Sequence, residues 1–239
     1  LDHAHASTTM FEIDTPCGYW RAPRSNTTAF VMQSFLDEMA HLAERDYVEF
    51  LLEMLGERRW FNPGNIRSLN TGRAADVIRL AAKQAGWGRQ LPENSGMGLA
   101  FYFCHAAHIA EVAELSVGAD NRLEIGKITV AVDVGPIINM SGARSQVEGA
   151  VIDGLSTMLA QKITMEGGRI QQSNFHDYEV LRMPQAPAVE IHFIQSDYTP
   201  TGLGEPALPP LAPAIGNAIF SATGHRVRTM PFSEQGYWI

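Results

Sequence analysis

Residues 201–224 read TGLGEPALPPLAPAIGNAIFSATG, and this stretch divides into a loop and a helix. Glycines and prolines between Pro200 and Pro210 oppose regular structure, because glycine frees the backbone and proline removes a hydrogen-bond donor. The apolar residues that follow predict a helix that begins among the prolines and ends near Gly224. A loop that leads into the amino end of a helix exposes free backbone N–H groups, which can hold an anion.

The rest of the chain predicts further helices and strands. Apolar periodicity predicts helices at 28–42, 46–55 and 74–85, and a capping-box pattern predicts one at 145–161. Apolar runs at 97–117 and 123–134 predict two neighbouring strands joined by a turn, with shorter strands at 8–13 and 189–193 and a linker at 92–98. These elements predict an α/β (α+β) fold of mixed sheets and flanking helices, with a helix-rich part, 1–92, and a second part, 93–239.

Composition narrows the classes of function. The chain has 239 residues, of which 45% are hydrophobic, enough for one large domain or two small ones. A net charge of -8 provides no broad positive field for a polyphosphate backbone, which argues against nucleic acid as a partner. Cys17 and Cys104 cannot build an iron–sulfur cluster or zinc ribbon alone, although one disulfide stays open. Neither a transmembrane segment nor an export signal is expected from the apolar runs.

Glu205 is the residue of the loop that could carry chemistry. Glycines on one side permit close approach of a ligand, and Pro206 stiffens the exit on the other side. A carboxylate in this setting can act as a general base. It can also be a solvated side chain beside a helix cap, and spacing alone favours this second interpretation.

Two other positions could bind a ligand. Gln146 lies in the first turn of the helix expected from 145, and this helix carries Gly149 and Gly154 where alanine is more usual. Small residues there indicate close packing, against either a flat ligand or a neighbouring strand. Arg21, within Trp20-Arg21-Ala22-Pro23, could hold a phosphate or pair with a surface acid.

The histidines provide no hydrolytic motif. His105 and His108 are three residues apart in an expected strand, so their side chains should point to opposite faces. The sequence contains no HExxH motif for zinc hydrolysis and no Gly-x-Ser-x-Gly nucleophile elbow.

Motifs along nearly the whole chain occur in a characteristic order. They are Phe35-Leu36-Asp37-Glu38-Met39-Ala40, Ala131-Val132-Asp133-Val134-Gly135, Gln146-Val147-Glu148-Gly149, Ser173-Asn174-Phe175-His176-Asp177-Tyr178, the stretch 202–224 and Arg226-Val227-Arg228. Together they resemble the xanthine dehydrogenase and aldehyde oxidase family of molybdenum hydroxylases. The similarity is to the C-terminal portion of the large, molybdopterin-binding beta subunit of the isoquinoline 1-oxidoreductase and bacterial aldehyde dehydrogenase branch.

The resemblance implies a cofactor and roles for particular residues. The cofactor is a molybdenum ion held through a pterin dithiolene, extended as a cytosine dinucleotide, with no metal ligand from the protein. Glu205 is implied as the catalytic base, and Gln146, Gly204, Arg21 and Ala22 as cofactor-binding residues. The implied reaction oxidises an aldehyde or N-heterocycle with oxygen from water and passes electrons to [2Fe–2S] clusters on a partner iron–sulfur subunit.

The chain departs from the family pattern in two places. The better-known members have Arg-Gly-Phe-Gly where this chain has Arg21-Ala22-Pro23-Arg24, which counts against direct contact between Arg21 and the substrate. The family's Gly-Gln-Gly cofactor motif is missing, which implies that an N-terminal portion or a companion chain completes the site. Export of relatives in the folded state implies the periplasm, with the cytoplasm as the alternative. The competing hypothesis is a non-catalytic binding or assembly domain, and the substrate's identity is open in either case.

Overall fold

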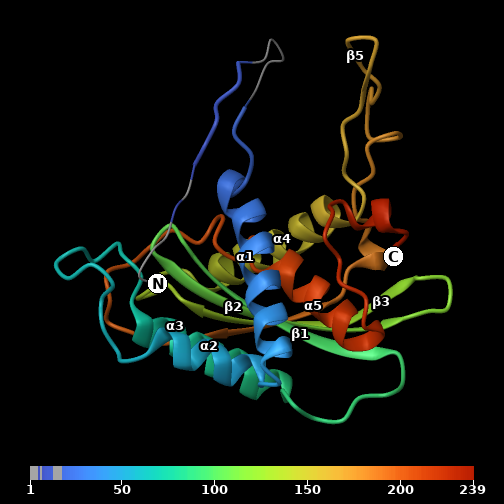
Figure 1. Ribbon diagram of the computed structural model, residues 1–239. Coiled ribbons are helices and arrows are strands. Elements are labelled where there is room, and N and C mark those ends of the chain that lie inside the picture. Colours follow the sequence, from blue (N-terminus) through green and yellow to red (C-terminus); the bar gives the residue numbers. More distant parts are fainter. Residues whose placement is uncertain (1–4, 6, 13–17) are drawn as a thin grey trace.

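A mixed four-stranded sheet forms the centre of the molecule (Figure 1). The structure is a computed structural model that describes residues 5, 7–12 and 18–239. The strands lie in the order β1 (Ser95–Cys104), β2 (Ala107–Val117), β3 (Leu123–Asp133) and β6 (Ala188–Phe193). The first three are antiparallel neighbours, and β6 runs parallel to β3. The predicted mixed α/β architecture is therefore confirmed.

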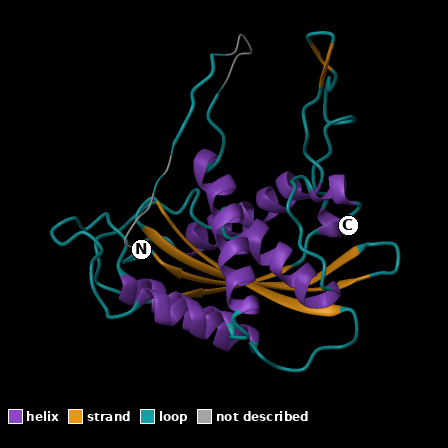
Figure 2. Cartoon of the chain, viewed as in Figure 1, coloured by secondary structure: helices purple, strands orange, loops and turns teal. Residues whose placement is uncertain are grey.

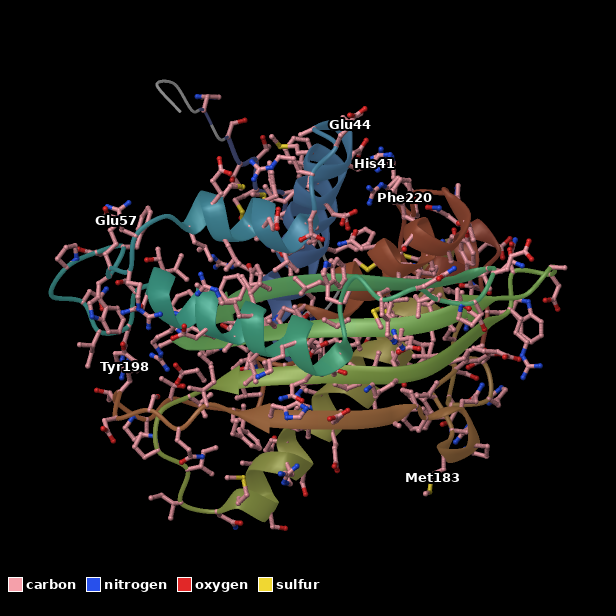
Figure 3. The ribbon with its side chains drawn as sticks, turned by 90° about the horizontal axis from the view of Figure 1, so that it is seen from below. His41, Glu44, Glu57, Met183, Tyr198 and Phe220 are labelled. Carbon is pink, nitrogen blue, oxygen red and sulfur yellow. The ribbon has the colours of Figure 1, made fainter. Side chains whose placement is uncertain are left out.

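Helices cover both faces of this sheet (Figure 2). They are α1 (Pro23–Leu42), α2 (Tyr47–Leu55), α3 (Thr71–Ala85), α4 (Met140–Leu159) and α5 (Leu211–Thr223). Helix α3 packs on one face with α2 beside it, as Figure 3 shows from that side, and α5 packs on the other face with α1 and α4 against it. An arm that carries the two-residue strands β4 (Met165–Glu166) and β5 (Arg169–Ile170) projects from the body. Short 3-10 helices lie at Met183–Gln185 and Phe232–Gln235.

Glycine allows α5 to lie directly on the sheet. A Cβ atom at Gly98 would lie 2.2 Å from the carbonyl oxygen of Ala214 and 2.2 Å from the amide nitrogen of Ala218, so only glycine fits this crossing. Asn217 then donates from Nδ2 to the carbonyl oxygen of Leu99 at 3.1 Å. This contact fixes the helix whose amino end follows the 200–210 loop.

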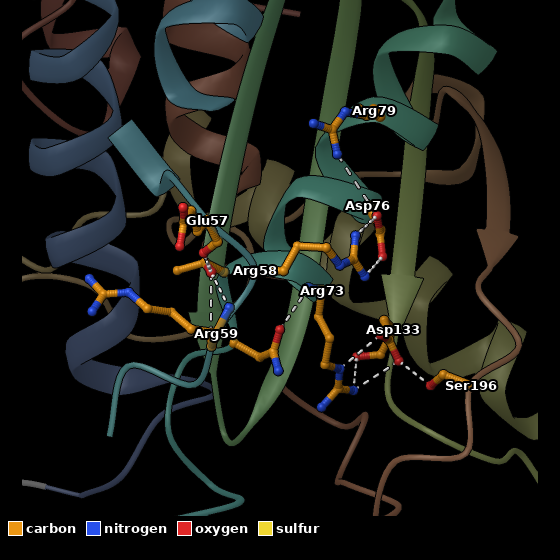
Figure 4. Close-up of polar contacts among 10 residues, drawn as sticks. Glu57, Arg58, Arg59, Arg73, Asp76, Arg79, Asp133 and Ser196 are labelled. Carbon is orange, nitrogen blue, oxygen red and sulfur yellow. Dashed lines mark hydrogen bonds and ion pairs between the residues drawn. The ribbon is translucent and has the colours of Figure 1, made fainter. Parts of the chain in front are cut away.

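A buried ion pair ties the end of β3 to its surroundings (Figure 4). Arg73 of α3 donates from Nε to Asp133 Oδ2 at 2.8 Å, and both side chains are only 2% exposed. Ser196 donates to the other carboxylate oxygen at 2.7 Å, and the Arg73 guanidinium lies 4.4 Å from the Tyr198 ring centroid. Ser196 lies three residues after the end of β6, so its hydrogen bond to Asp133 holds the chain that leads to the Glu205 loop at the end of β3.

Several sequence expectations were wrong because long-range pairing overrode local signals. The run 97–117 is a hairpin of two strands, and burial on both faces of the sheet keeps most of this run apolar. The linker expected at 92–98 was also wrong, since β1 already begins at Ser95. Residues 8–12 form no strand, and Ile13, the last residue of that expected strand, lies outside the described residues. The division at residue 92 stays a prediction.

The start of α4 was also misplaced. Asn139 is the N-cap residue, and its side chain accepts a hydrogen bond from the backbone N–H of Gly142 at 2.9 Å. Ser145 lies inside the helix and donates from Oγ to the carbonyl oxygen of Ser141 at 3.1 Å. The capping-box pattern at Ser145 was therefore wrong as a helix start, whereas the end of the helix at Leu159 lies close to the expected position.

Glu111 on β2 has an unusual environment. Its side chain is fully buried, and neither carboxylate oxygen has a hydrogen-bond partner among the described residues. Burial raises the pKa of Glu111 well above its ordinary value. The folded protein therefore keeps this side chain protonated at a pH where the unfolded chain releases the proton.

Glu111→Gln is expected to stabilise the protein selectively at higher pH. A raised pKa stabilises the wild type below the unfolded pKa, and this stabilisation is lost as the pH rises toward the folded pKa. The variant should equal the wild type near pH 4 and then gain about 1.4 kcal/mol for each pH unit within that window. Urea unfolding at several pH values measures this difference, and parallel stability profiles for the two proteins would contradict it.

Candidate functional site

The Glu205 loop meets residues from distant parts of the chain. The backbone N–H of Ala22, at the start of α1, donates to Glu205 Oε1 at 2.7 Å. Ala22 is almost fully buried and has a left-handed backbone with φ of 53°, a conformation that is costly for a residue with a Cβ. This strained turn aims the N–H group at the carboxylate.

Arg21 holds the loop from the other side. Its Nε donates to the carbonyl oxygen of Gly204, and Nη2 donates to the carbonyl oxygen of Gln146 at 3.1 Å. Nη1 lies 3.6 Å from Asp153 Oδ2. The guanidinium thus links the loop to α4, so its contacts are with the protein chain. All five residues expected at the site, Arg21, Ala22, Gln146, Gly204 and Glu205, come together.

His105 is a further member of the site that the sequence analysis missed. It was expected in a strand, but it lies with Ala106 in the turn between β1 and β2, and both residues have positive φ angles. Its Nε2 lies 3.1 Å from Glu205 Oε2. The length of the 97–117 run was a usable signal, since it exceeds an ordinary strand and predicts a reversal near its middle.

His108 has a different role from His105. It is fully buried on β2, where Nε2 accepts a hydrogen bond from the backbone N–H of Asn70 at 3.1 Å. Burial lowers the pKa of His108 to about 3, so the imidazole stays neutral and belongs to the core.

A cavity of roughly 560 Å³ opens beside Glu205. Its lining is mainly apolar or backbone, and it includes a few polar side chains: Ile66, Arg67, Phe103, His105, Ala106, Thr199, Pro200, Thr201, Gly202, Gly204, Glu205 and Pro206. Thr201 Oγ1 is buried there without a hydrogen-bond partner among the described residues. The volume and lining suit a small organic molecule.

The structure describes only one of the two cysteines. Cys104 carries a free, buried thiol, while Cys17 lies outside the described residues, so the disulfide hypothesis stays a prediction.

Within residues 18–239, none of the helices combines the length and the hydrophobicity that a membrane crossing requires.

Known proteins with related sequences identify the family. A family model described as "Molybdopterin cofactor-binding domain" matches residues 34–187. The membrane-bound aldehyde dehydrogenase [pyrroloquinoline-quinone] of Gluconacetobacter polyoxogenes is 35% identical over 90% of this chain and 29% of its own length. Isoquinoline 1-oxidoreductase subunit beta of Brevundimonas diminuta is 33% identical over 84% of this chain and 25% of its own length. The chain therefore spans less than a third of either relative.

A solved structure shares the fold. The aldehyde oxidoreductase of Desulfovibrio gigas superposes with a TM-score of 0.68 over 89% of this chain and 40% of that chain, at 13% identity. That likeness bears on the fold alone, whereas the family match spans more than half of the sequence and confirms the resemblance drawn from the motifs. This chain belongs to the molybdopterin cofactor-binding domain family of xanthine dehydrogenases and aldehyde oxidoreductases.

Proposed function

We propose that this chain supplies the general base and part of the cofactor site of a molybdenum hydroxylase that oxidises an aldehyde or an N-heterocycle. Glu205 is the base, and the observation that carries the proposal is its position. The carboxylate faces a cavity sized for a small molecule, and hydrogen-bonding groups from α1 and from the β1–β2 turn contact its two oxygens. A solvated side chain beside a helix cap, the other interpretation of the sequence, would need neither contact.

The residues around Glu205 fit a pterin cofactor. The Gln146 side chain is exposed, and its amide nitrogen makes no hydrogen bond to any described residue, so it remains available to a ligand with polar ring edges. Gly204 lies beside it, where an added Cβ would be 3.8 Å from Gln146 Oε1. Within 18–239, no three His, Cys, Asp or Glu side chains gather as metal ligands. Gln146 and the Gly204 backbone would hold the cofactor, with Arg21 and Ala22 supporting them.

The bound cofactor would supply the two-electron oxidation, and the chain's own residues would manage the proton and the substrate. Glu205 accepts the proton from the water-derived nucleophile, because a carboxylate oxygen keeps a free lone pair after accepting one hydrogen bond. The Ala22 N–H holds Oε1, so Oε2 and its lone pair keep a fixed direction. Phe103, Pro200 and Pro206 shape an apolar wall that orients the substrate ring or chain and excludes water.

The wider assembly is part of the same proposal. The cofactor is the cytosine dinucleotide form, an N-terminal portion or companion chain completes its site, and an iron–sulfur subunit with [2Fe–2S] clusters takes the electrons. The periplasm is the proposed compartment. The name of the Gluconacetobacter relative specifies pyrroloquinoline quinone, but the match to a molybdopterin-binding family model supports molybdenum for this chain.

Isotope labelling tests the reaction. The complex purified through a tag on this chain is incubated in H₂¹⁸O with aromatic aldehydes or N-heterocycles and an artificial electron acceptor. The expected product carries one ¹⁸O atom from water. Absence of turnover with both substrate classes, or oxygen that derives from O₂, would contradict the proposal and favour a non-catalytic binding or assembly domain.

A further inference from the structure

The β1–β2 turn places an imidazole between a thiol and the Glu205 carboxylate. His105 and Ala106 form a two-residue loop between the paired residues Cys104 and Ala107, with φ angles of 53° and 64°. This left-handed geometry is the usual form of a tight hairpin turn, and it directs the His105 side chain toward the loop that carries Glu205. The imidazole nitrogens therefore contact different partners, with Nε2 3.1 Å from Glu205 Oε2 and Nδ1 2.8 Å from Cys104 Sγ.

Cys104 is suited to donate a proton in this arrangement. Its side chain is buried, and burial raises the pKa of the thiol, so the sulfur keeps its hydrogen at neutral pH. The contact with Ser25 Oγ, at 3.3 Å, allows the thiol to donate there, but the serine hydroxyl is both donor and acceptor and in the reverse direction donates to the sulfur. The S–H group is then left to donate to His105 Nδ1. A neutral imidazole that accepts at Nδ1 carries its hydrogen on Nε2, where it faces the carboxylate.

We infer that His105 is a positioning residue for Glu205, with Cys104 fixing the imidazole tautomer so that Nε2–H donates to Glu205 Oε2. This inference rests on the proposed function, in which Glu205 is the base. With the Ala22 N–H on Oε1, donors on both oxygens fix the plane of the carboxylate. A base held in one orientation loses less of its activity to unproductive rotation.

Other roles for this group fit the structure less well. A nucleophilic cysteine requires an exposed thiolate, whereas Cys104 is buried and stays protonated. A metal site requires more ligands than the structure offers, since the part of the chain described from residue 18 onward contains no cluster of three potential ligands. The positions of the hydrogen-bonding atoms therefore favour a role through Glu205.

A matched pair of substitutions separates positioning from a merely structural role. His105→Gln keeps an N–H donor at a reach similar to that of Nε2, whereas His105→Asn is too short but tolerates the left-handed backbone better. A structural role predicts that Asn is the milder change. Positioning predicts the reverse: we expect His105→Asn to lower kcat by about 10- to 100-fold with little change in KM, and His105→Gln to recover most of this loss.

Kinetics of the assembled enzyme and its molybdenum content measure this difference, with His176→Gln as a control on an exposed histidine outside the cavity. The inference is supported if kcat follows the order wild type, Gln, Asn at equal molybdenum content. It is overturned if His105→Asn keeps the wild-type kcat, or if it equals or exceeds His105→Gln.

A second readout needs no turnover. Nitrogen-15 NMR of the histidine-labelled complex, with His105→Gln used to assign the signal, should show a neutral imidazole protonated at Nε2. Cys104→Ala removes the S–H donor and should allow the other tautomer to appear. A wild-type imidazole protonated at Nδ1 overturns the inference. This signal does not depend on catalysis. A complex that shows the expected tautomer but no hydroxylase activity would therefore refute the proposed function and leave the inferred hydrogen bond between His105 and Glu205 intact.

Discussion

Glu205→Gln is expected to lower kcat by about 100- to 10 000-fold, the range that general bases contribute, while molybdenum content and KM stay close to those of the wild type. Glutamine has nearly the shape of glutamate, and its carbonyl oxygen can still accept the hydrogen bond from the Ala22 N–H. It cannot accept the proton. Steady-state kinetics and metal analysis on the same preparation measure the two quantities.

The control for this substitution is Glu179→Gln, which removes an exposed carboxylate outside the cavity. It is expected to keep wild-type kinetics. Retention of full activity by Glu205→Gln would eliminate this residue as the base. Loss of activity together with loss of molybdenum would show that the side chain serves assembly, and it would also count against the proposed role.

Arg73→Met is expected to destabilise the protein by about 3 to 5 kcal/mol, the usual cost of removing one partner from a buried ion pair. The substitution leaves Asp133 charged, 2% exposed and without its cation. Ser196 and the backbone N–H of Gly135 continue to donate to the carboxylate, but they provide no compensating charge. Urea unfolding of the variant and the wild type at neutral pH measures the loss.

The double variant Arg73→Met/Asp133→Asn is the matched control. Asparagine keeps an oxygen that can accept from Ser196 and Gly135, and no unpaired charge remains in the core. We expect the double variant to recover most of the lost stability. A double variant that is as unstable as Arg73→Met would show that packing by the guanidinium, including its contact with Tyr198, outweighs the charge pairing.

Patterns of neighbouring residues in the sequence predicted the helices and the turns whose formation depends mainly on those residues. Helices over 28–42, 46–55 and 74–85 lie within two or three residues of α1, α2 and α3, apart from the earlier start of α1. The apolar spacing agrees with burial in α3, whereas Val31, Phe35 and Met39 of α1 are exposed. The loop that ends at Pro210 and the C-terminal cap at Gly224 were also predicted, since proline and glycine act on the backbone directly.

The contacts that build the site lay beyond such patterns. Arg21 and Gly204 are 183 residues apart in the chain, and no periodicity or turn rule brings them together. Their proximity could be expected only from the family resemblance, which named both. His105 was expected in a strand and not at the site, because its turn lies within a long strand-like run and its residues, His and Ala, lack the Asn-Gly signature of left-handed hairpins.

Buried polar groups were equally hard to predict. Asp133 follows an apolar strand and resembles a surface residue in the sequence, yet its charge is paired inside the protein with Arg73. Glu111 shares its face of β2 with the buried Ile109 and Ala113, and helices cover both faces of the sheet, so its carboxyl has no access to solvent. Whether a sheet is covered on one face or on both depends on the whole fold.

Molybdenum content tests the central claim most directly. The complex is purified from its native host through a tag on this chain, and molybdenum and iron are measured by elemental analysis together with the amount of the chain. We expect near-stoichiometric molybdenum, with iron in a co-purifying subunit. A correctly assembled complex that contains no molybdenum would contradict the proposed hydroxylase and leave a non-catalytic binding or assembly domain as the better account of Glu205 and its cavity.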